Sequence, residues 1–213
     1  MSELIFDCLD GRAEPYAAAP TLSFRLRIAE TTGLAVQSIA LRCQVRIQPE
    51  RRGYSATERE RLRDLFGEPS RWGETLRPFQ LATVALMVPG FRGSMEIDVP
   101  VPCSYDLEVA AGQYFRALGD GEIPLLMLFS GTVFAKDADG GLAVEQVPWD
   151  RETSYRLPVR VWQDLMDLYF PNSGWLLLRR GTVDALGRFK SRHALPTWDD
   201  TLSAVLKEAG ETD

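Results

Sequence analysis

Two stretches near the N-terminus alternate apolar and polar residues with the period of a β-strand. From Ile39 to Gln48 every second side chain is apolar, and the polar side chains between them include Arg42 and Arg46. Side chains alternate between the two faces of a strand, so the pattern predicts a strand that is buried on one face and wet on the other. Residues 21–30 repeat the pattern, and a turn at 31–33 separates the two stretches. We therefore expect the two neighbours to form an antiparallel sheet over a core.

Four further strands follow from the same reasoning, at about 76–88, 94–101, 124–135 and 142–147. The stretch 124–135 is apolar at both sets of alternate positions, which is typical of a central strand buried on both faces. Pro100 occupies an outward-facing position of its strand and indicates a sheet edge or a bulge. Residues 1–20 fit either an edge strand or a lead-in segment.

Helical signals appear at two places. Ser55 and Glu58 have the spacing of a capping box, and Gly67 supplies a stop, which predicts a short inserted helix near 56–66. From Pro158 onward the apolar period becomes helical, as in the stripe formed by Trp162, Leu165, Met166 and Tyr169. The predicted fold class is α+β, mainly β. It is an antiparallel β-sandwich over residues 1–157 with one inserted helix and a C-terminal helical segment, 158–213, packed on it as a single structural unit.

Composition narrows the classes of function. The chain has 213 residues, 45% of them hydrophobic and 25% charged, as expected of a folded protein. Its net charge of −6 argues against a nucleic-acid partner. The most apolar stretch, residues 123–135, is shorter than the ~20 residues of a membrane helix, so we expect no membrane association. The three cysteines show no paired spacing, which favours a reduced, cytoplasmic protein.

Candidate chemistry is sparse. The single histidine, His193, lies in a polar segment, and Ser130 lacks the preceding glycine of a nucleophile elbow. The scattered cysteines and the turn acids Asp137 and Asp139 do not make a zinc or calcium ligand set. No phosphate-binding glycine loop is present. We expect no catalytic residue, metal or cofactor; an enzyme that uses His193 or a buried carboxylate stays open as an alternative.

Arginines provide the candidate partner-binding surface. The outward-facing residues of the first two strands would form a basic face that docks an acidic protein partner. The region around the inserted helix would be part of the same face. The arginines concerned are Arg25, Arg27, Arg42, Arg46, Arg51, Arg52, Arg59 and Arg63. The alternative is that sheets need polar outer faces and that the genome favours arginine codons, since only three of the 24 basic residues are lysines.

Aromatic residues cluster where the strands give way to helices. They fit core packing between sheet and helices, and they also allow a small-ligand or lipid pocket between the sheet and the C-terminal helices. The residues that would line such a pocket are Trp149, Tyr155, Trp162 and Trp175. Self-association through exposed sheet edges also stays open.

Several sequence blocks, spread over roughly residues 20 to 206, resemble an uncharacterised bacterial family, a domain of unknown function. The blocks lie at residues 51–54, 65–67 with Trp72, 100–106, 114–118 with Gly121, 124–131, 147–150 and 171–175. Genes of that family tend to lie in actinobacterial-type uptake nickel–iron hydrogenase clusters. The resemblance implies a role in hydrogenase maturation, assembly or stability and carries over no functional residue. We therefore expect a non-catalytic accessory protein that binds a hydrogenase subunit or maturation factor.

Overall fold

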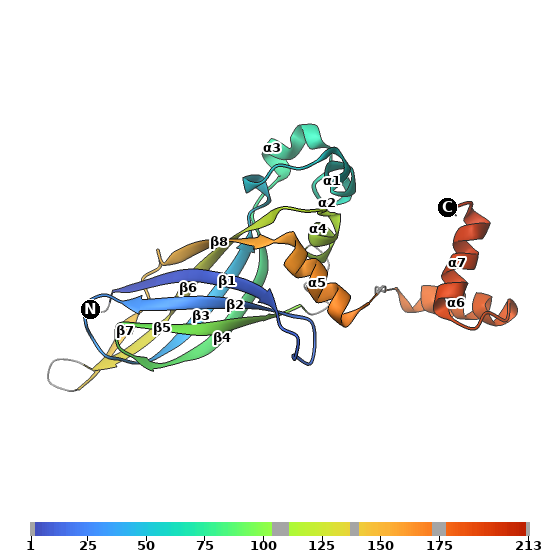
Figure 1. Ribbon diagram of the computed structural model, residues 1–213. Coiled ribbons are helices and arrows are strands. Elements are labelled where there is room, and N and C mark those ends of the chain that lie inside the picture. Colours follow the sequence, from blue (N-terminus) through green and yellow to red (C-terminus); the bar gives the residue numbers. More distant parts are fainter. Residues whose placement is uncertain (1–2, 104–110, 137–140, 172–177, 212–213) are drawn as a thin grey trace. The chain divides into compact units, whose positions relative to one another are not determined.

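Eight strands in the described residues form two antiparallel sheets (Figure 1). The computed structural model describes residues 3–103, 111–136, 141–171 and 178–211. Sheet A has the order β1-β2-β5, and sheet B has the order β4-β3-β6, with β7 and β8 both paired to the free side of β6. The strands are β1 Leu4–Ala13, β2 Thr21–Glu30, β3 Val36–Ile47, β4 Phe79–Phe91, β5 Ser94–Pro102, β6 Glu122–Lys136, β7 Leu142–Gln146 and β8 Glu152–Pro158.

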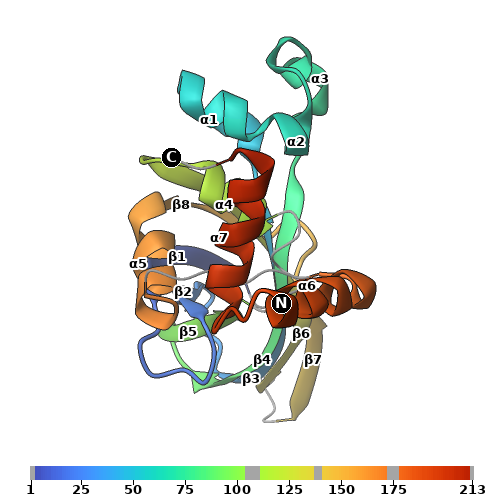
Figure 2. The ribbon, with the colours of Figure 1, turned by 90° about the vertical axis from the view of Figure 1, so that its right-hand side faces the viewer.

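The inner faces of the two sheets pack against each other as a sandwich (Figure 2). The rings of Phe6 in sheet A and Phe129 in sheet B stack with their centroids 4.3 Å apart. Phe24 of β2 meets Tyr155 of β8 edge to face at 6.1 Å. The inward beats that the sequence predicts for β2 and β3 are fully buried, and Leu26 and Ile39 are 0% exposed. The predicted, mainly β sandwich is therefore confirmed.

The prediction that β2 and β3 pair with each other is wrong. β2 lies between β1 and β5, whereas β3 lies between β4 and β6. The connection through residues 31–35 therefore carries the chain from one sheet to the other. Both strands bury one face, so alternation alone does not reveal which neighbour completes the ladder.

β6 is the central strand of sheet B, as predicted, and it changes partner along its length. Its first half pairs with β8 up to Leu128, and its second half pairs with β7 from Thr132 onward. Gly131 stands at the change with φ +147°, and a Cβ built there would lie 2.1 Å from the backbone oxygen of Ala40 on β3. Only glycine allows this close approach of β6 to β3. Apart from the buried Pro124, the outward-facing residues of β6 are half-buried or exposed, so the prediction that this strand is buried on both faces is wrong.

Short helices lie at one end of the sandwich (Figures 1 and 2). The insertion after β3 holds α1 Ala56–Arg61, α2 Arg63–Phe66 and α3 Trp72–Thr75, and α4 Ala111–Ala117 precedes β6. The predicted capping box is present, with Ser55 accepting from the Glu58 backbone and the Glu58 carboxylate accepting from the Ser55 N–H. Trp72 begins α3 and is buried.

α5, Val159–Tyr169, packs on the sandwich through its predicted apolar stripe. Trp162 and Leu165 are 3% and 0% exposed, and the indole of Trp162 lies 4.6 Å from the ring of Phe115. The hydroxyl of Tyr169 donates to the carbonyl oxygens of Glu14 and Ala17, which ties the end of α5 to the segment after β1. The helix therefore belongs to the sandwich unit.

The chain divides into two compact units, Met1–Asn172 and Ser173–Asp213. The second unit contains α6, Arg180–Arg192, and α7, Trp198–Ala209. α7 begins with a second capping box, formed by Thr197 and Asp200, and ends at Gly210 in the left-handed conformation. The unit boundary thus lies after α5 rather than before it, and the packing of α6 and α7 on the sandwich stays a prediction.

Candidate protein-docking surfaces

The predicted arginine face is divided between two sheets. Arg25 and Arg27 lie on the outer face of sheet A, whereas Arg42 and Arg46 lie on the outer face of sheet B. These faces point away from each other across the sandwich, so the four arginines do not form one surface. The prediction of a single basic face is wrong because it assumed that β2 and β3 are neighbours.

Acidic residues neutralise the arginines of sheet A. Arg25 stands directly across from Asp98 of β5, and its Nε donates to the carboxylate at 2.8 Å. Arg12 of β1 donates to the other oxygen of Asp98 at 3.0 Å. Burial raises the pKa of Asp98, but these hydrogen bonds and charges outweigh it and hold the pKa below its ordinary value of 3.8.

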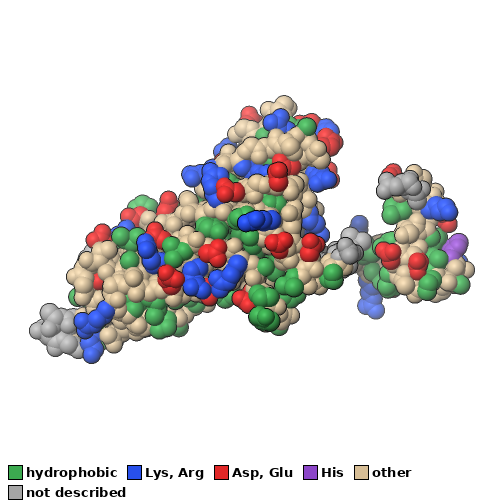
Figure 3. Space-filling view, viewed as in Figure 1, with side chains coloured by type: hydrophobic (Ala, Val, Ile, Leu, Met, Phe, Trp, Pro, Cys, Tyr) green, Lys and Arg blue, Asp and Glu red, His purple; other side chains and the backbone are tan. Residues whose placement is uncertain are grey.

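Arg27 is also paired across strands. Its Nη2 donates to the carboxylate of Asp7 at 2.8 Å, and the two residues are direct cross-strand partners. Figure 3 shows basic and acidic side chains interleaved over β1 and β2. The outer face of sheet A is therefore a mixed, internally paired surface rather than a basic one.

The outer face of sheet B is different in character. Arg42 lines a shallow depression of about 580 Å³ over β3, β4 and β6, together with Met87 and Ala85. Within the described residues, no acidic side chain forms an ion pair with Arg42 or Arg46. Met87 is 62% exposed and stands directly across from Ala40. This face combines unpaired positive charge with exposed apolar area.

Apolar exposure continues across sheet B to its far edge. Val144 of β7 stands across from Phe134 of β6, and Leu142 stands across from Lys136. Leu142 and Val144 are 67% and 57% exposed. Isolated apolar side chains on a surface are ordinary, but several on one sheet face that also carries arginines match the composition of protein interfaces.

Arg52 is a structural residue of the inserted segment. Its Nη2 donates to the Glu58 carboxylate at 2.8 Å, and the two side chains are only 8% and 6% exposed. Its other donors reach the carbonyl oxygens of Gly53, Asp120 and Glu122. These bonds join the insertion to the turn before β6. A buried and fully paired guanidinium is not available to a partner, so Arg52 drops out of the candidate surface.

Glu58 is the centre of this network. Burial alone would raise the pKa of its carboxyl, but hydrogen bonds from the N–H groups of Ser55 and Gly119 and the charge of Arg52 outweigh burial. The pKa of Glu58 is therefore below its ordinary value of 4.5. The capping-box pattern identifies Glu58 as a cap, but no sequence signal links it to Arg52 or Gly119.

The other arginines of the insertion remain at the surface. Arg63 pairs with the carboxylates of Glu60 and Glu68, and Nε of Arg59 donates to the carbonyl oxygen of Tyr54. Arg51 is exposed and lines a separate depression beside Arg156. Of the eight predicted partner-binding residues, Arg42, Arg46, Arg51 and Arg59 therefore have no acidic partner in the described part of the chain. Arg46 and Arg59 each donate to a backbone carbonyl oxygen instead, that of Pro78 and that of Tyr54.

The predicted aromatic pocket is not assembled from the residues the structure describes. Trp162 is packed in the core against Phe115, and Trp149 is 93% exposed. Tyr155 is half-buried between the sheets, where it packs against Phe24. Trp175 lies outside the described residues. Trp149 and Trp162 thus occupy opposite environments and do not line one cavity.

His193 and the potential metal ligands named above can be placed only as far as the structure describes them. No group of three or more His, Cys, Asp or Glu side chains in that part of the chain is placed to hold a metal ion, and Asp137 and Asp139 lie outside it. The imidazole of His193 stacks on the ring of Phe189 at 4.3 Å. None of the described helices has both the length and the apolar content needed to cross a membrane.

The fold and surfaces describe a β-sandwich with an exposed sheet face and a helical C-terminal unit. The chain belongs to a family of unknown function, DUF6084, whose model matches residues 1–213. No curated protein matches the chain.

Solved structures give only distant similarity. A β-glucosidase from Kluyveromyces marxianus is 10% identical, with 73% of this chain and 15% of that one covered and a TM-score of 0.25. The putative ApaA protein from Bordetella pertussis is also 10% identical, with 73% and 93% covered and a TM-score of 0.27. A β-glucosidase 3B from Thermotoga neapolitana is 11% identical, with 73% and 17% covered and a TM-score of 0.27. The chain spans less than a fifth of the length of either β-glucosidase.

Proposed function

We propose that the protein is a non-catalytic accessory protein of the cytoplasm that binds a protein partner through the outer face of sheet B. One observation carries the proposal: on this face Arg42 lacks an acidic partner among the described residues and stands next to the exposed Met87. Arginine and methionine are enriched at protein interfaces, and an arginine left unpaired on one partner can meet a carboxylate on the other.

The two sheets supply an internal comparison. Sheet A also carries arginines on its outer face, but Asp98 and Asp7 neutralise them within the chain. Sheet B leaves Arg42 without an acidic partner among the described residues and beside the apolar side chains of Ala85 and Met87. Arg46 on the same face donates to the carbonyl oxygen of Pro78 rather than to a carboxylate. A partner that presents an apolar side chain beside a carboxylate fits this face.

The partner that we propose is a hydrogenase subunit or a hydrogenase maturation factor. The support is the family resemblance described above, whose genes tend to lie beside uptake nickel–iron hydrogenase genes. The protein would then act on assembly or stability of the hydrogenase by holding one of its components, without performing a reaction.

The test is affinity capture of the tagged protein from its own host, grown to express hydrogenase, followed by binding measurements with each purified candidate. Two matched pairs of variants distinguish binding at the outer face of sheet B from binding at the outer face of sheet A. Arg42→Gln and Met87→Glu change the outer face of sheet B, whereas Arg27→Gln and Leu9→Glu make the same changes on sheet A. Leu9 is 44% exposed. The proposal expects at least a tenfold loss of affinity for the sheet B variants and less than threefold for the sheet A variants, since central hot-spot residues cost more than ~1.4 kcal/mol.

Three other outcomes would count against parts of the proposal. Equal losses from both pairs would overturn sheet B as the docking face. Specific capture of an unrelated protein, with the expected variant pattern, would keep the docking face and remove the hydrogenase assignment. Failure of every hydrogenase component to bind the purified protein, with no other specific partner recovered, would overturn the accessory function.

A further inference from the structure

The α6–α7 unit lacks a core of its own. Thr201 is its one buried residue among those the structure describes, and α6 contains none. The helices have 13 and 12 residues, a length that is marginal for helices without tertiary packing. α7 nevertheless has a cap at each end, a capping box at Thr197 and a left-handed cap at Gly210. Such a hairpin needs another surface to bury its apolar side.

Apolar side chains line one side of each helix. Trp198, Leu202, Val205 and Leu206 follow the i, i+4, i+7, i+8 spacing on α7, and Trp198 and Leu206 are about half exposed, at 50% and 49%. On α6, Val183 is 39% exposed. Val183, Trp198 and Leu206 are therefore left partly uncovered within the hairpin.

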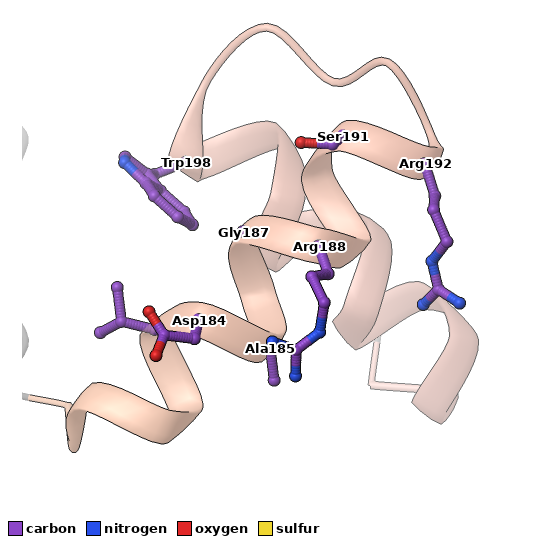
Figure 4. A pocket seen from close by; sticks show the side chains of 8 residues that line it. Asp184, Ala185, Gly187, Arg188, Ser191, Arg192 and Trp198 are labelled. Carbon is purple, nitrogen blue, oxygen red and sulfur yellow. The ribbon is translucent and has the colours of Figure 1, made fainter.

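A groove runs along α6 beside the first residue of α7. It has a volume of about 970 Å³, and its lining includes Asp184, Arg188, Arg192 and Trp198 (Figure 4). The indole of Trp198 lies over Gly187, where an added Cβ would be 3.8 Å from its Cη2.

The two helices carry opposite charge. α6 has four basic residues, Arg180, Arg188, Lys190 and Arg192, against one acid, and α7 has three acids, Asp199, Asp200 and Glu208, against one base. Lys190 caps the turn between the helices by donating to the carbonyl oxygens of Leu195 and Pro196. Within the described residues, Arg188 and Arg192 form no ion pair with α7 or with any other acid. The complementary charges are thus present but not paired inside one hairpin.

We propose that the α6–α7 hairpin associates with the same hairpin of a second copy of the chain to form a four-helix bundle. A two-fold arrangement places the basic α6 of each copy against the acidic α7 of the other, so the charges that are unpaired in one copy become paired twice. The exposed halves of Val183, Trp198 and Leu206 enter the common core. This inference concerns self-association and is independent of the proposed docking function of sheet B.

The test is sedimentation velocity on the full-length chain and on two charge-reversed variants. The wild type is expected at twice its monomer mass of 23.9 kDa. Arg188→Glu with Arg192→Glu, and separately Asp199→Lys with Glu208→Lys, are each expected to raise the dimer dissociation constant at least ~100-fold, since opposed like charges cost several kcal/mol. An equimolar mixture of the two variants is expected to restore the dimer, because the reversed α6 of one fits the reversed α7 of the other.

Arg61→Glu with Arg71→Glu is the matched control, since both residues are exposed, lie outside the hairpin and change the net charge equally. It is expected to leave the dimer intact, and circular dichroism of every variant checks that the helices persist. A monomeric wild type at ~100 µM would overturn the proposal. So would a dimer that survives both reversals, a dimer that is lost equally in the control, or a mixture that stays monomeric although both variants are folded.

Discussion

The guanidinium of Arg52 donates a 2.8 Å hydrogen bond to the Glu58 carboxylate, and neither side chain is more than 8% exposed. The pair joins the inserted segment after β3 to the turn that opens β6, because Arg52 also reaches the Asp120 and Glu122 carbonyl oxygens. Two residues near the inserted helix thus hold it at one end of the sandwich. An insertion fixed in this way is part of the folding unit.

We predict that Glu58→Ala lowers the free energy of unfolding by about 3–5 kcal/mol, because it leaves the buried charge of Arg52 unpaired. It also removes the acceptor for the N–H groups of Ser55 and Gly119. Urea unfolding monitored by circular dichroism measures the change. Glu60→Ala, at a side chain that is 71% exposed on the same helix, should stay within about 0.5 kcal/mol. A loss for Glu58→Ala no larger than the ~1 kcal/mol of a simple cap would contradict the prediction.

Stability should fall in acid, partly through the same residue. Because the pKa of Glu58 is lower in the folded chain than its ordinary value of 4.5, its contribution is complete above that value. The contribution is lost as the pH falls through the lower, folded-state pKa. The difference in unfolding free energy between wild type and Glu58→Gln should therefore be constant near neutral pH and shrink below about pH 4.5. Urea titrations at successive pH values measure it, and a difference that stays constant into strong acid would argue against the charged pair.

Gly131→Ala should destabilise the sandwich by about 2–5 kcal/mol, from backbone strain at positive φ together with a clash. The new Cβ would stand 2.1 Å from the Ala40 oxygen, which is a backbone atom and can move only if the β3–β6 ladder shifts. Gly73→Ala is the control, since a Cβ there meets nothing within 4 Å. Thermal and urea unfolding of both variants give the comparison, and similar stabilities would show that β6 tolerates a side chain at its change of partner.

Truncation of two tryptophans of the predicted pocket should change the stability of the protein by very different amounts. Trp162→Ala removes a side chain that is 3% exposed and packed on Phe115, so the free energy of unfolding is expected to fall by about 3–5 kcal/mol. Trp149→Ala changes a side chain that is 93% exposed and should alter stability by no more than about 0.5 kcal/mol. Acrylamide quenching provides a second readout, since loss of Trp149 should reduce the quenchable fluorescence more than loss of Trp162.

The periodic patterns located most strands and the first helix because they depend only on local spacing. Alternation in residues 21–30 and 39–47 defines which side chains point inward, whatever the neighbouring strand is. The Ser55–Glu58 capping box is likewise recognised from two residues that are three positions apart, and it is present as predicted. Pro100 on β5 correctly indicated an edge, because proline lacks the N–H that an inner strand would need.

The candidate surface could be predicted only in part. The outward beat correctly placed Arg42 and Arg46 on an exposed sheet face, but it gave the same result for Arg25 and Arg27. The difference comes from strands that are distant in sequence, since β5 brings Asp98 to Arg25 and β1 brings Asp7 to Arg27. Charge along one strand does not show which charges face it across the ladder.

The sequence by itself determined most of the local elements, the inward and outward faces of the predicted strands and the opposite net charges of the segments that form α6 and α7. Only the tertiary structure decided that β2 and β3 belong to different sheets, that Arg52 is buried against Glu58, and that Gly131 lies against Ala40. The physical reason is the sequence separation over which each kind of interaction acts. Side-chain alternation, helix capping and helix charge arise between residues a few positions apart, whereas strand partners, ion pairs and close backbone contacts depend on segments that meet only when the whole sandwich closes.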